Sequence, residues 1–288
     1  MPASDNEIVP GLARGCRASQ VSQALRAIHD DDSSGRNTWP VAGYQILVSA
    51  DRATRERAYA LAYRVYRRAG YVTDSGPELC VSAHDLSAQT LTLLAQDAHG
   101  NDCATISLAF DSRNHGLPCD EIYRAETDAL RAAGCKLAEV TRLAIDESCS
   151  GAKDLLLHFF NQCYIFARIV SGHTDVLIEV NPRHVSFYEK VMRFEVAGPE
   201  RPCSRVQGAP ALLLRANFDA IEAAVKGTGC TGGRDAAGRR LHAYPYSKRE
   251  ETAVARFLMQ QHRPMSAEDA FYFRSLQRKS PSVALTIR

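Results

Sequence analysis

The segment 175–180, DVLIEV, is the feature of the sequence that most constrains the fold. Its almost unbroken apolar run is typical of a strand covered on both faces, as in sheets with helices on either side. Asn181 and Pro182 follow directly. An asparagine side chain caps helices well, and proline fits the first helical position because its missing N–H is not needed there. The sequence therefore predicts a buried strand that leads at once into a short helix over 184–192, HVSFYEKVM.

Strands and helices alternate along much of the chain. Further strands are expected at 44–50, 89–97, 102–110, 136–145 and 211–218, and the main helices at 51–70, 120–134 and 154–170. Residues 98–101 join two of these strands as a hairpin, which is antiparallel, whereas helices connect most of the others. This combination predicts an α/β fold with a mixed sheet and helices on both faces.

The two ends of the chain differ in composition from its middle. Residues 1–40 are polar and predict a flexible N-terminal arm, and the glycine-rich stretch 226–238 predicts a linker. Two helices are expected beyond this linker, over 247–261 and 266–277. We therefore expect a main domain over 41–222 and an appended region, consisting of the linker and a helical extension, over 223–288.

Charge and composition argue against several classes of protein. The 35 lysines and arginines nearly balance the 33 acidic residues and are spread through the chain, which is not the charge pattern of a nucleic-acid-binding protein. No run approaches the roughly 18 apolar residues of a membrane helix and no secretory signal is evident, so we expect a cytoplasmic protein with no transmembrane segment. The nine cysteines form no C-x-x-C pair, which argues against a metal site or a disulfide framework.

Residues 181–194 carry a motif that resembles a known family. The pattern Asn-x-x-x-x-x-Phe-Tyr-Glu-Lys-x-x-x-Phe after an apolar strand resembles the last conserved block of the GNAT acyltransferases. The FeeM-type N-acyl amino acid synthases are resembled more closely, in residues 60–71, 180–201, 206–214 and 263–273. The strand 138–145, with its Glu-x-x-Arg, resembles that of the LuxI-type acyl-homoserine lactone synthases, which share the fold.

The resemblance implies both a fold and a reaction. The fold is GNAT-like, with a mixed sheet flanked by helices and a C-terminal helical extension. The reaction is transfer of a fatty acyl group from acyl carrier protein to the amine of an amino acid. The donor is then a thioester on phosphopantetheine, and no cofactor or metal is expected, because an amine attacks a thioester without either.

Two other functions remain open. One is an acyl-homoserine lactone synthase-like enzyme that uses S-adenosylmethionine, although the acidic cluster of that family is not evident between Gly70 and Gln89. The other is a catalytically silent binding module for acyl carrier protein or a lipid. This second alternative rests on Arg193, where the resembling family has glycine, and on Ala62, where it commonly has arginine.

The segment 146–154, DESCSGAKD, bears on the acyl donor. GNAT enzymes that use coenzyme A bind its pyrophosphate through successive backbone N–H groups of a glycine-rich loop at a helix N-terminus. The segment has a single glycine, Gly151, and lacks that loop motif. This favours a donor that offers only the phosphopantetheine arm, namely acyl carrier protein.

The resemblance implies roles for three residues in the reaction. Glu139 is the expected general base, because a half-buried carboxylate can have a raised pKa. Tyr188 is the expected acid at the leaving thiolate, although its position in an apolar stripe also fits a core residue. Strict strand alternation puts Arg142 on the face opposite Glu139, but a bulge could bring both to the same side. Arg142 is expected to orient a carboxylate or contact the donor, unless it is a surface residue.

Four further residues are expected to contact substrate. Arg64 points away from the apolar side of its helix, toward either solvent or the acceptor cleft. Asn181 and Arg183 open the tyrosine helix, where a solvated first turn is the alternative for Arg183. Phe160 lies on the long apolar helix 154–170, which either lines an acyl tunnel or is plain core.

Overall fold

The computed structural model describes residues 37–41, 43–72, 77–149, 152–227 and 246–277. Within this part of the chain, one eight-stranded sheet has the order β1-β2-β3-β4-β5-β6-β8-β7. Its strands are β1 (Trp39–Val41), β2 (Tyr44–Val48), β3 (Leu91–Gln96), β4 (Asp102–Phe110), β5 (Leu137–Ile145), β6 (Asp175–Val180), β7 (Glu195–Cys203) and β8 (Ala209–Asn217). Strands β5 and β6 are parallel and the other neighbours are antiparallel, which confirms the predicted mixed sheet.

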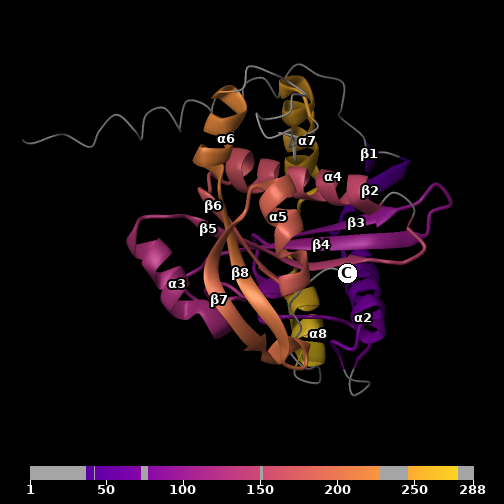
Figure 1. The fold of residues 1–288 in the computed structure, drawn as a ribbon. Coiled ribbons are helices and arrows are strands. Elements are labelled where there is room, and N and C mark those ends of the chain that lie inside the picture. Colours follow the sequence, from indigo (N-terminus) through magenta and orange to yellow (C-terminus); the bar gives the residue numbers. More distant parts are fainter. Residues whose placement is uncertain (1–36, 42, 73–76, 150–151, 228–245, 278–288) are drawn as a thin grey trace, which may run out of the picture.

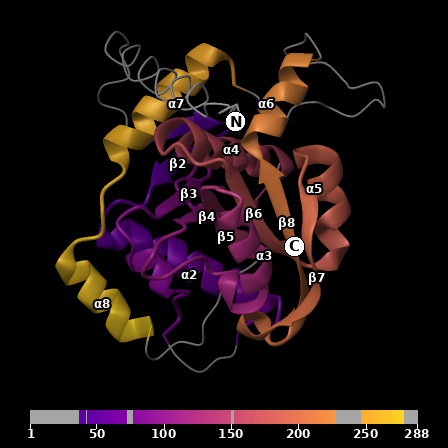
Figure 2. The same ribbon diagram turned by 90° about the vertical axis from the view of Figure 1, so that its left-hand side faces the viewer.

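Helices cover both faces of this sheet (Figures 1 and 2). The face that we call the α4 face is covered by α4 (Ala152–Tyr164), the π-helix η3 (Ile165–Val170), α5 (Val185–Met192) and α7 (Lys248–Gln261). The opposite face, the α2 face, is covered by α2 (Arg52–Arg68) and α3 (Asp120–Ala132). Helix α6 (Phe218–Gly227) follows β8, and α8 (Ala267–Gln277) packs outside α2.

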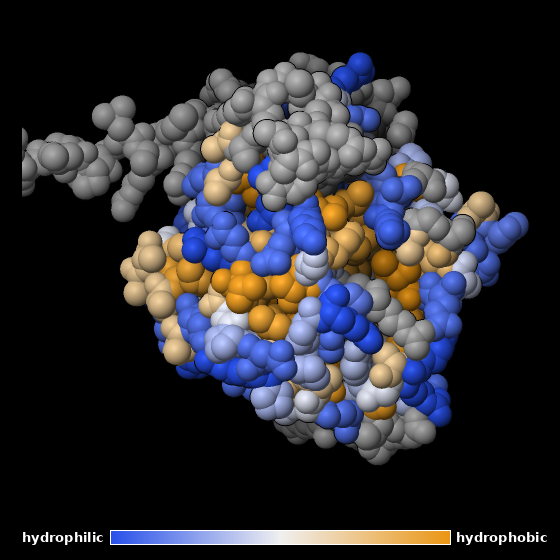
Figure 3. Space-filling view, viewed as in Figure 1, coloured by the Kyte–Doolittle hydropathy of each residue, from blue (hydrophilic) through white to orange (hydrophobic). Residues whose placement is uncertain are grey.

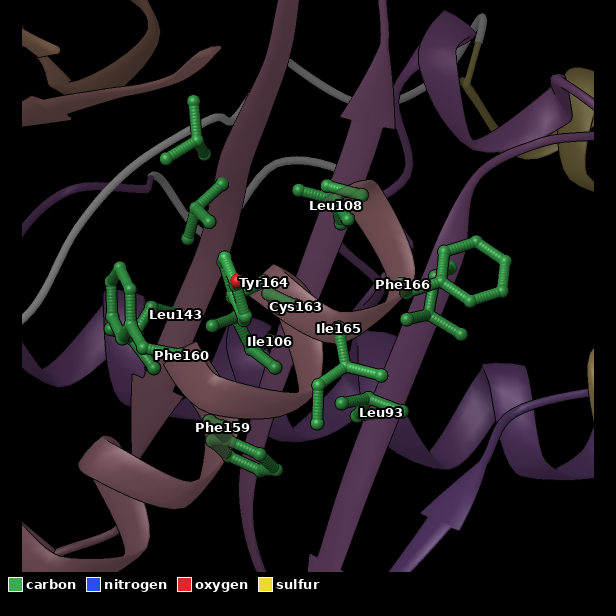
Figure 4. Packing of buried hydrophobic residues seen from close by; sticks show 14 of the residues in the cluster. Leu93, Ile106, Leu108, Leu143, Phe159, Phe160, Cys163, Tyr164, Ile165 and Phe166 are labelled. Atoms are coloured by element: carbon green, nitrogen blue, oxygen red, sulfur yellow. The ribbon is translucent and has the colours of Figure 1, made fainter. Parts of the chain in front are cut away.

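The largest part of the core lies between the sheet and α4. Phe159, Phe160 and Ile165 are buried on this helix and its π-helical continuation. Figure 4 shows the side chains of this segment against those of the strands, including Leu93 and Ile106. Because α4 is apolar on most of its surface, burial of these side chains holds it against the centre of the sheet.

The segment after β6 folds as its sequence predicts. The Asn181 side chain accepts a hydrogen bond from the Arg183 backbone N–H at 3.3 Å, and Pro182 begins the 3₁₀-helix η4 (Pro182–His184) that leads into α5. Arg193 ends α5 in the left-handed region, with φ of 58°. Glycine is the residue that adopts this conformation most readily, which explains why the resembling family has glycine where this chain has arginine.

The C-terminal helices pack on the same body as the sheet. Helix α7 contributes Val254, Phe257 and Leu258 to the core on the α4 face. Helix α8 places Phe273 against Tyr59 of α2, with 5.4 Å between the ring centroids. Figure 2 shows that the two helices lie on opposite sides of the sheet, so that the C-terminal helical region spans both.

Three elements differ from the sequence-based prediction. The edge strand β7 was not expected, because Pro199 and Pro202 interrupt its pattern; prolines are tolerated at a sheet edge, where no neighbour needs their N–H. The three-residue strand β1 was assigned to the arm, and α6 extends into the predicted linker. The rest of that linker and most of the expected arm lie outside the described residues.

Candidate active site

The centre of the sheet opens where β5 and β6 part. Their parallel ladder runs from Leu137–Asp175 to Val140–Ile178 and ends there. Beyond this point β5 continues along β4 as far as Ile145, while β6 continues along β8. Ligands of open α/β sheets bind at the carboxyl ends of strands at such points, so the opening is the candidate active site.

A β-bulge in β5 shapes one side of this opening. The register with β4 slips between Thr105 and Ser107, so that Ile106 lies opposite both Arg142 and Leu143. Arg142 has a left-handed φ of 49°, and its side chain turns to the α2 face. The bulge thus brings Arg142 to the same face as Glu139, which strict alternation would not have done.

Arg142 is buried in that position, and its two terminal nitrogens are hydrogen-bonded. Its guanidinium donates to both carboxylate oxygens of Asp85, in the 3₁₀-helix η2 (Ala83–Leu86), and to the Ser107 hydroxyl at 3.1 Å. It also lies over the Tyr59 ring, 4.7 Å from the ring centroid. Arg142 therefore orients a neighbouring carboxylate, one of the two arrangements expected from the sequence, and it fixes the bulge against α2 and η2.

Glu139 is completely buried on the α2 face. Its Oε2 accepts a hydrogen bond of 2.8 Å from the backbone N–H of Cys119, at the start of α3. Its Oε1 has no hydrogen-bond partner among the described residues. Burial raises the pKa of this carboxyl, and the nearby Glu179 raises it further. The result is a carboxyl that holds its proton more strongly than an ordinary glutamate.

A second buried carboxylate lies beside Glu139. Glu179 of β6 pairs with Arg205, which comes from the 3₁₀-helix η5 (Ser204–Val206) and also donates to the carbonyl of Pro118. The sequence analysis did not select either residue. The available signal was a glutamate within the otherwise apolar run DVLIEV, because a buried acid requires a partner.

Tyr188 lies on the α4 face. Its ring is completely buried and packs near those of Phe160 and Phe194, with centroids 5.8 Å away in both cases. Its hydroxyl has no hydrogen-bond partner in the described part of the chain, and burial raises its pKa. A buried hydroxyl without a partner is unfavourable in a plain core, so this group calls for a functional explanation.

Tyr66 connects the two faces at the opening. It comes from α2, and its hydroxyl donates to the carbonyl of Leu143, just beyond the bulge, at 3.3 Å. Burial raises the pKa of Tyr66, and Tyr188 is among the groups that raise it further. The two phenols therefore lie close together, although their helices cover opposite faces. The sequence analysis did not select Tyr66.

A mainly apolar cavity lies on the α4 face, and two of its lining rings, those of Phe160 and Phe194, pack near Tyr188. Its lining includes Val140, Val176, Ala216, Phe160, Met192 and Phe194. Its volume is about 20 Å³, which is close to the space of one water molecule. Phe160 thus lies in the wall of a cavity as well as in the core, and a longer apolar ligand would enter only if these side chains move.

The arrangement of β5, β6 and α5 can be compared with known proteins. The family model described as N-acyl amino acid synthase FeeM matches residues 57–217, more than half of the 288 residues. The chain belongs to the FeeM family of N-acyl amino acid synthases. It is an acyltransferase, as the resemblance of its motifs implied. A search among curated proteins found no match.

The solved structure of FeeM supports the fold of this FeeM-family protein, and other solved structures are less similar to it. FeeM, an N-acyl amino acid synthase from uncultured soil microbes, is 23% identical with a TM-score of 0.54, over 61% of this chain and 90% of that one. The AHL synthase LasI is 16% identical with a TM-score of 0.46, over 60% and 89% of the two chains. A ribosomal-protein-S5-alanine acetyltransferase from Vibrio fischeri is 12% identical with a TM-score of 0.43, over 63% and 97%.

The remaining predicted substrate residues lie nearer the surface of the FeeM-family domain. Arg64 is exposed and forms no hydrogen bond or ion pair within the described residues. Arg183 is exposed and donates to the hydroxyl of Tyr71 at 3.3 Å and to the His184 ring at 3.0 Å. Asn181 caps its helix. The structure therefore brings Glu139, Arg142 and Tyr188 to the opening, whereas the Arg64 side chain is exposed.

The surface near the opening is apolar. Figure 3 shows apolar residues in the middle of the face seen in Figure 1, on both sides of α5 and framed by hydrophilic residues. Ile145 at the end of β5 and Val185 and Phe187 of α5 are partly buried apolar residues. Within the described ranges, no cluster of three or more His, Cys, Asp or Glu could hold a metal, and no helix could span a membrane.

Proposed function

We propose that this acyltransferase moves a fatty acyl group from acyl carrier protein to the amine of an amino acid. The product is an N-acyl amino acid, and the donor is a thioester on the phosphopantetheine arm. No metal or redox cofactor takes part in this scheme, because an amine attacks a thioester directly. The proposal assigns the base to the α2 face and the acyl chain to the α4 face.

One observation carries the proposal. Two buried oxygens without hydrogen-bond partners among the described residues, Oε1 of Glu139 and the hydroxyl of Tyr188, belong to opposite faces of the sheet beside the same opening. Native proteins leave few buried polar atoms unpaired, and those that remain are often functional. A substrate that lies between β5 and β6 would give both atoms a partner.

Glu139 suits the role of general base. The amino group of the acceptor arrives as an ammonium and must lose a proton before it can attack. Glu139 takes that proton onto Oε1, and its raised pKa makes the transfer more favourable than it would be for an ordinary carboxylate. The free amine then forms a bond to the thioester carbonyl carbon.

Tyr188 suits the role of a hydrogen-bond donor to the leaving sulfur. When the tetrahedral intermediate collapses, the C–S bond breaks and the nitrogen loses its second proton, which the thiolate takes. Because burial raises the pKa of Tyr188, complete loss of its proton is unfavourable. It therefore stabilises the developing thiolate through a hydrogen bond, and its contribution is smaller than that of Glu139.

The donor is inferred from the segment between β5 and α4. The sequence 146–154 lacks the glycine-rich motif with which GNAT enzymes bind the pyrophosphate of coenzyme A. An acyl carrier protein brings the phosphopantetheine arm without that nucleotide. The partly buried apolar residues around α5 also suit the passage of a fatty acyl chain.

The proposal is tested with the purified protein, matched acyl-carrier-protein and acyl-CoA donors, and a panel of amino acids. We expect N-acyl amino acids by mass spectrometry, and kcat/KM at least about tenfold higher for the carrier-protein donor. Comparable values for both donors would refute the donor assignment. A parallel reaction with S-adenosylmethionine as acceptor tests for lactone synthesis instead.

A matched variant separates catalysis from binding. Glu139→Gln keeps the size of the side chain and removes its basicity. We expect it to retain the carrier protein in a binding assay while forming little product. Retention of the carrier protein by the wild type with no acylated product from any amino acid would indicate a binding module and overturn the proposed enzyme.

A further inference from the structure

Glu139 shares its buried site with another carboxylate and a single arginine. The register places Glu139 opposite Leu177, so Glu179 is the next residue of β6 on the same face. The Glu179 and Arg205 side chains are 0% and 3% exposed. Water therefore offers little screening to any of the three groups, and their charges must balance within the site.

The contacts of Arg205 show which carboxylate it neutralises. One of its terminal nitrogens pairs with Oε2 of Glu179, and the other donates to the carbonyl of Pro118. Glu139 has a backbone N–H on Oε2 and no partner on Oε1 among the described residues. One arginine cannot balance two ionised carboxylates, so the pair takes up one proton more readily than two separate carboxylates would.

We propose that Glu179 and Arg205 are positioning residues: their ion pair makes Glu139, and not Glu179, the carboxyl that takes up a proton at Oε1. The inference rests on the role of Glu139 in the proposed function. An ion pair between Glu179 and Arg205 leaves Glu139 as the carboxyl without a countercharge. When Glu139 is ionised, it accepts a proton from an ammonium readily: an N–H bond breaks, an O–H bond forms, and two charges disappear together.

Among the described residues, the other groups that face the site do not supply a second positive charge. At the start of α3, Cys119 contributes a buried thiol whose pKa is raised by burial and by Glu139. Glu121 of α3 reaches Arg205 at 3.7 Å and adds negative charge. From β4, the residue opposite Glu139 is the apolar Ala109. The charge of Arg205 therefore decides which carboxyl is ionised.

The test is the pH dependence of Glu179→Gln. This variant removes the repelling charge and frees Arg205 to pair with Glu139. We expect the acid limb of the kcat/KM profile to move to lower pH by about one unit or more. Arg205→Met should move it to higher pH, and Glu179→Asp should restore the wild-type position. A carboxyl titration of Glu139 by ¹³C NMR in the free protein should shift in the same directions.

Asp175→Asn is the matched control. Asp175 is a buried carboxylate of the same strand, paired with Arg215, but it lies four residues from Glu179. Its loss should lower stability without moving the profile. An unchanged Glu139 titration in both Glu179→Gln and Arg205→Met would overturn the inference. Full activity of Glu139→Gln would instead refute the proposed base, while the NMR titration would still decide the inference.

Discussion

The two faces of the sheet at the β5–β6 opening differ sharply in chemistry. The α2 face buries carboxyl and guanidinium side chains there, among them Glu139, Glu179, Arg205, Arg142 and Asp85. The α4 face buries mainly aromatic and aliphatic side chains, among them Tyr188, whose hydroxyl has no hydrogen-bond partner among the described residues. Charged groups are costly to bury unless they are paired, whereas apolar groups stabilise the fold by burial alone.

This difference indicates how the site divides its work. Proton transfer from an ammonium requires a basic group whose pKa the surroundings control, and the α2 face has one. The fatty acyl chain of the proposed donor requires an apolar wall without competing charge, and the α4 face has the side chains for one. At the opening between the strands, the charged groups of the α2 face and the apolar groups of the α4 face lie on opposite sides of the sheet.

The largest expected effect follows from removal of the base. Glu139→Gln should lower kcat/KM by about 10²- to 10⁴-fold at neutral pH, because an ammonium cannot attack a thioester. The deficit should shrink at high pH, where free amine accumulates. Steady-state rates across pH measure both effects. A deficit that stays constant with pH would show that Glu139 does not act as the base.

Glu139→Gln is also expected to raise the stability of the fold, although it lowers activity. The folded-state pKa of Glu139 is raised above its unfolded value of about 4.5. Protonated Glu139 therefore makes its full contribution to the free energy of unfolding below that value. This contribution is lost as pH rises through the folded-state pKa. The variant resembles the protonated form, so its melting temperature should exceed that of the wild type increasingly as pH rises above neutrality.

The next effect concerns the buried ion pair on the same face. Asp85→Asn keeps the shape of the side chain but leaves the charge of Arg142 buried without its countercharge. We expect a loss of about 3–5 kcal/mol in the free energy of unfolding, measured by urea denaturation. The double variant Asp85→Asn/Arg142→Met should recover part of that loss. If the double variant recovers no stability, the Asp85–Arg142 pair stabilises the protein mainly by fixing the bulge.

The smallest effect is expected on the α4 face. Tyr188→Phe removes one hydroxyl and leaves the ring in place, so we expect a loss of about tenfold to a hundredfold, mainly in kcat. The melting temperature should stay the same or rise slightly, because a buried hydroxyl without a partner is lost. A change of less than about threefold in rate would make Tyr188 a core residue only.

Local pattern was sufficient to predict most of the fold. The cap at Asn181, the helix that carries Tyr188 and the central strands all follow from short-range signals of spacing and side-chain type. Edge strand β7 escaped because Pro199 and Pro202 conceal it, although it pairs with β8, the next strand along the chain. This segment forms a strand because it pairs with the sheet, and not because its own residues favour strand structure.

The candidate site was less predictable, for a different physical reason. Arg142 reaches the face of Glu139 only through a one-residue bulge, and strand periodicity assumes that no bulge exists. Glu179 and Arg205 meet only after β6 and η5 have folded together. Such partners are set by tertiary contacts, so the sequence identified the catalytic candidate Glu139 but not the groups that control its proton.

The packing of α7 has a consequence for synthesis of the protein. Val254, Phe257 and Leu258 complete the core on the α4 face, yet they are translated after every strand of the sheet. A nascent chain can therefore pair its strands while part of the apolar α4 face is still open to solvent. Surfaces of this kind bind chaperones and promote aggregation. The ribosome-bound intermediate, and not the finished enzyme, is thus the form in which this chain is most vulnerable.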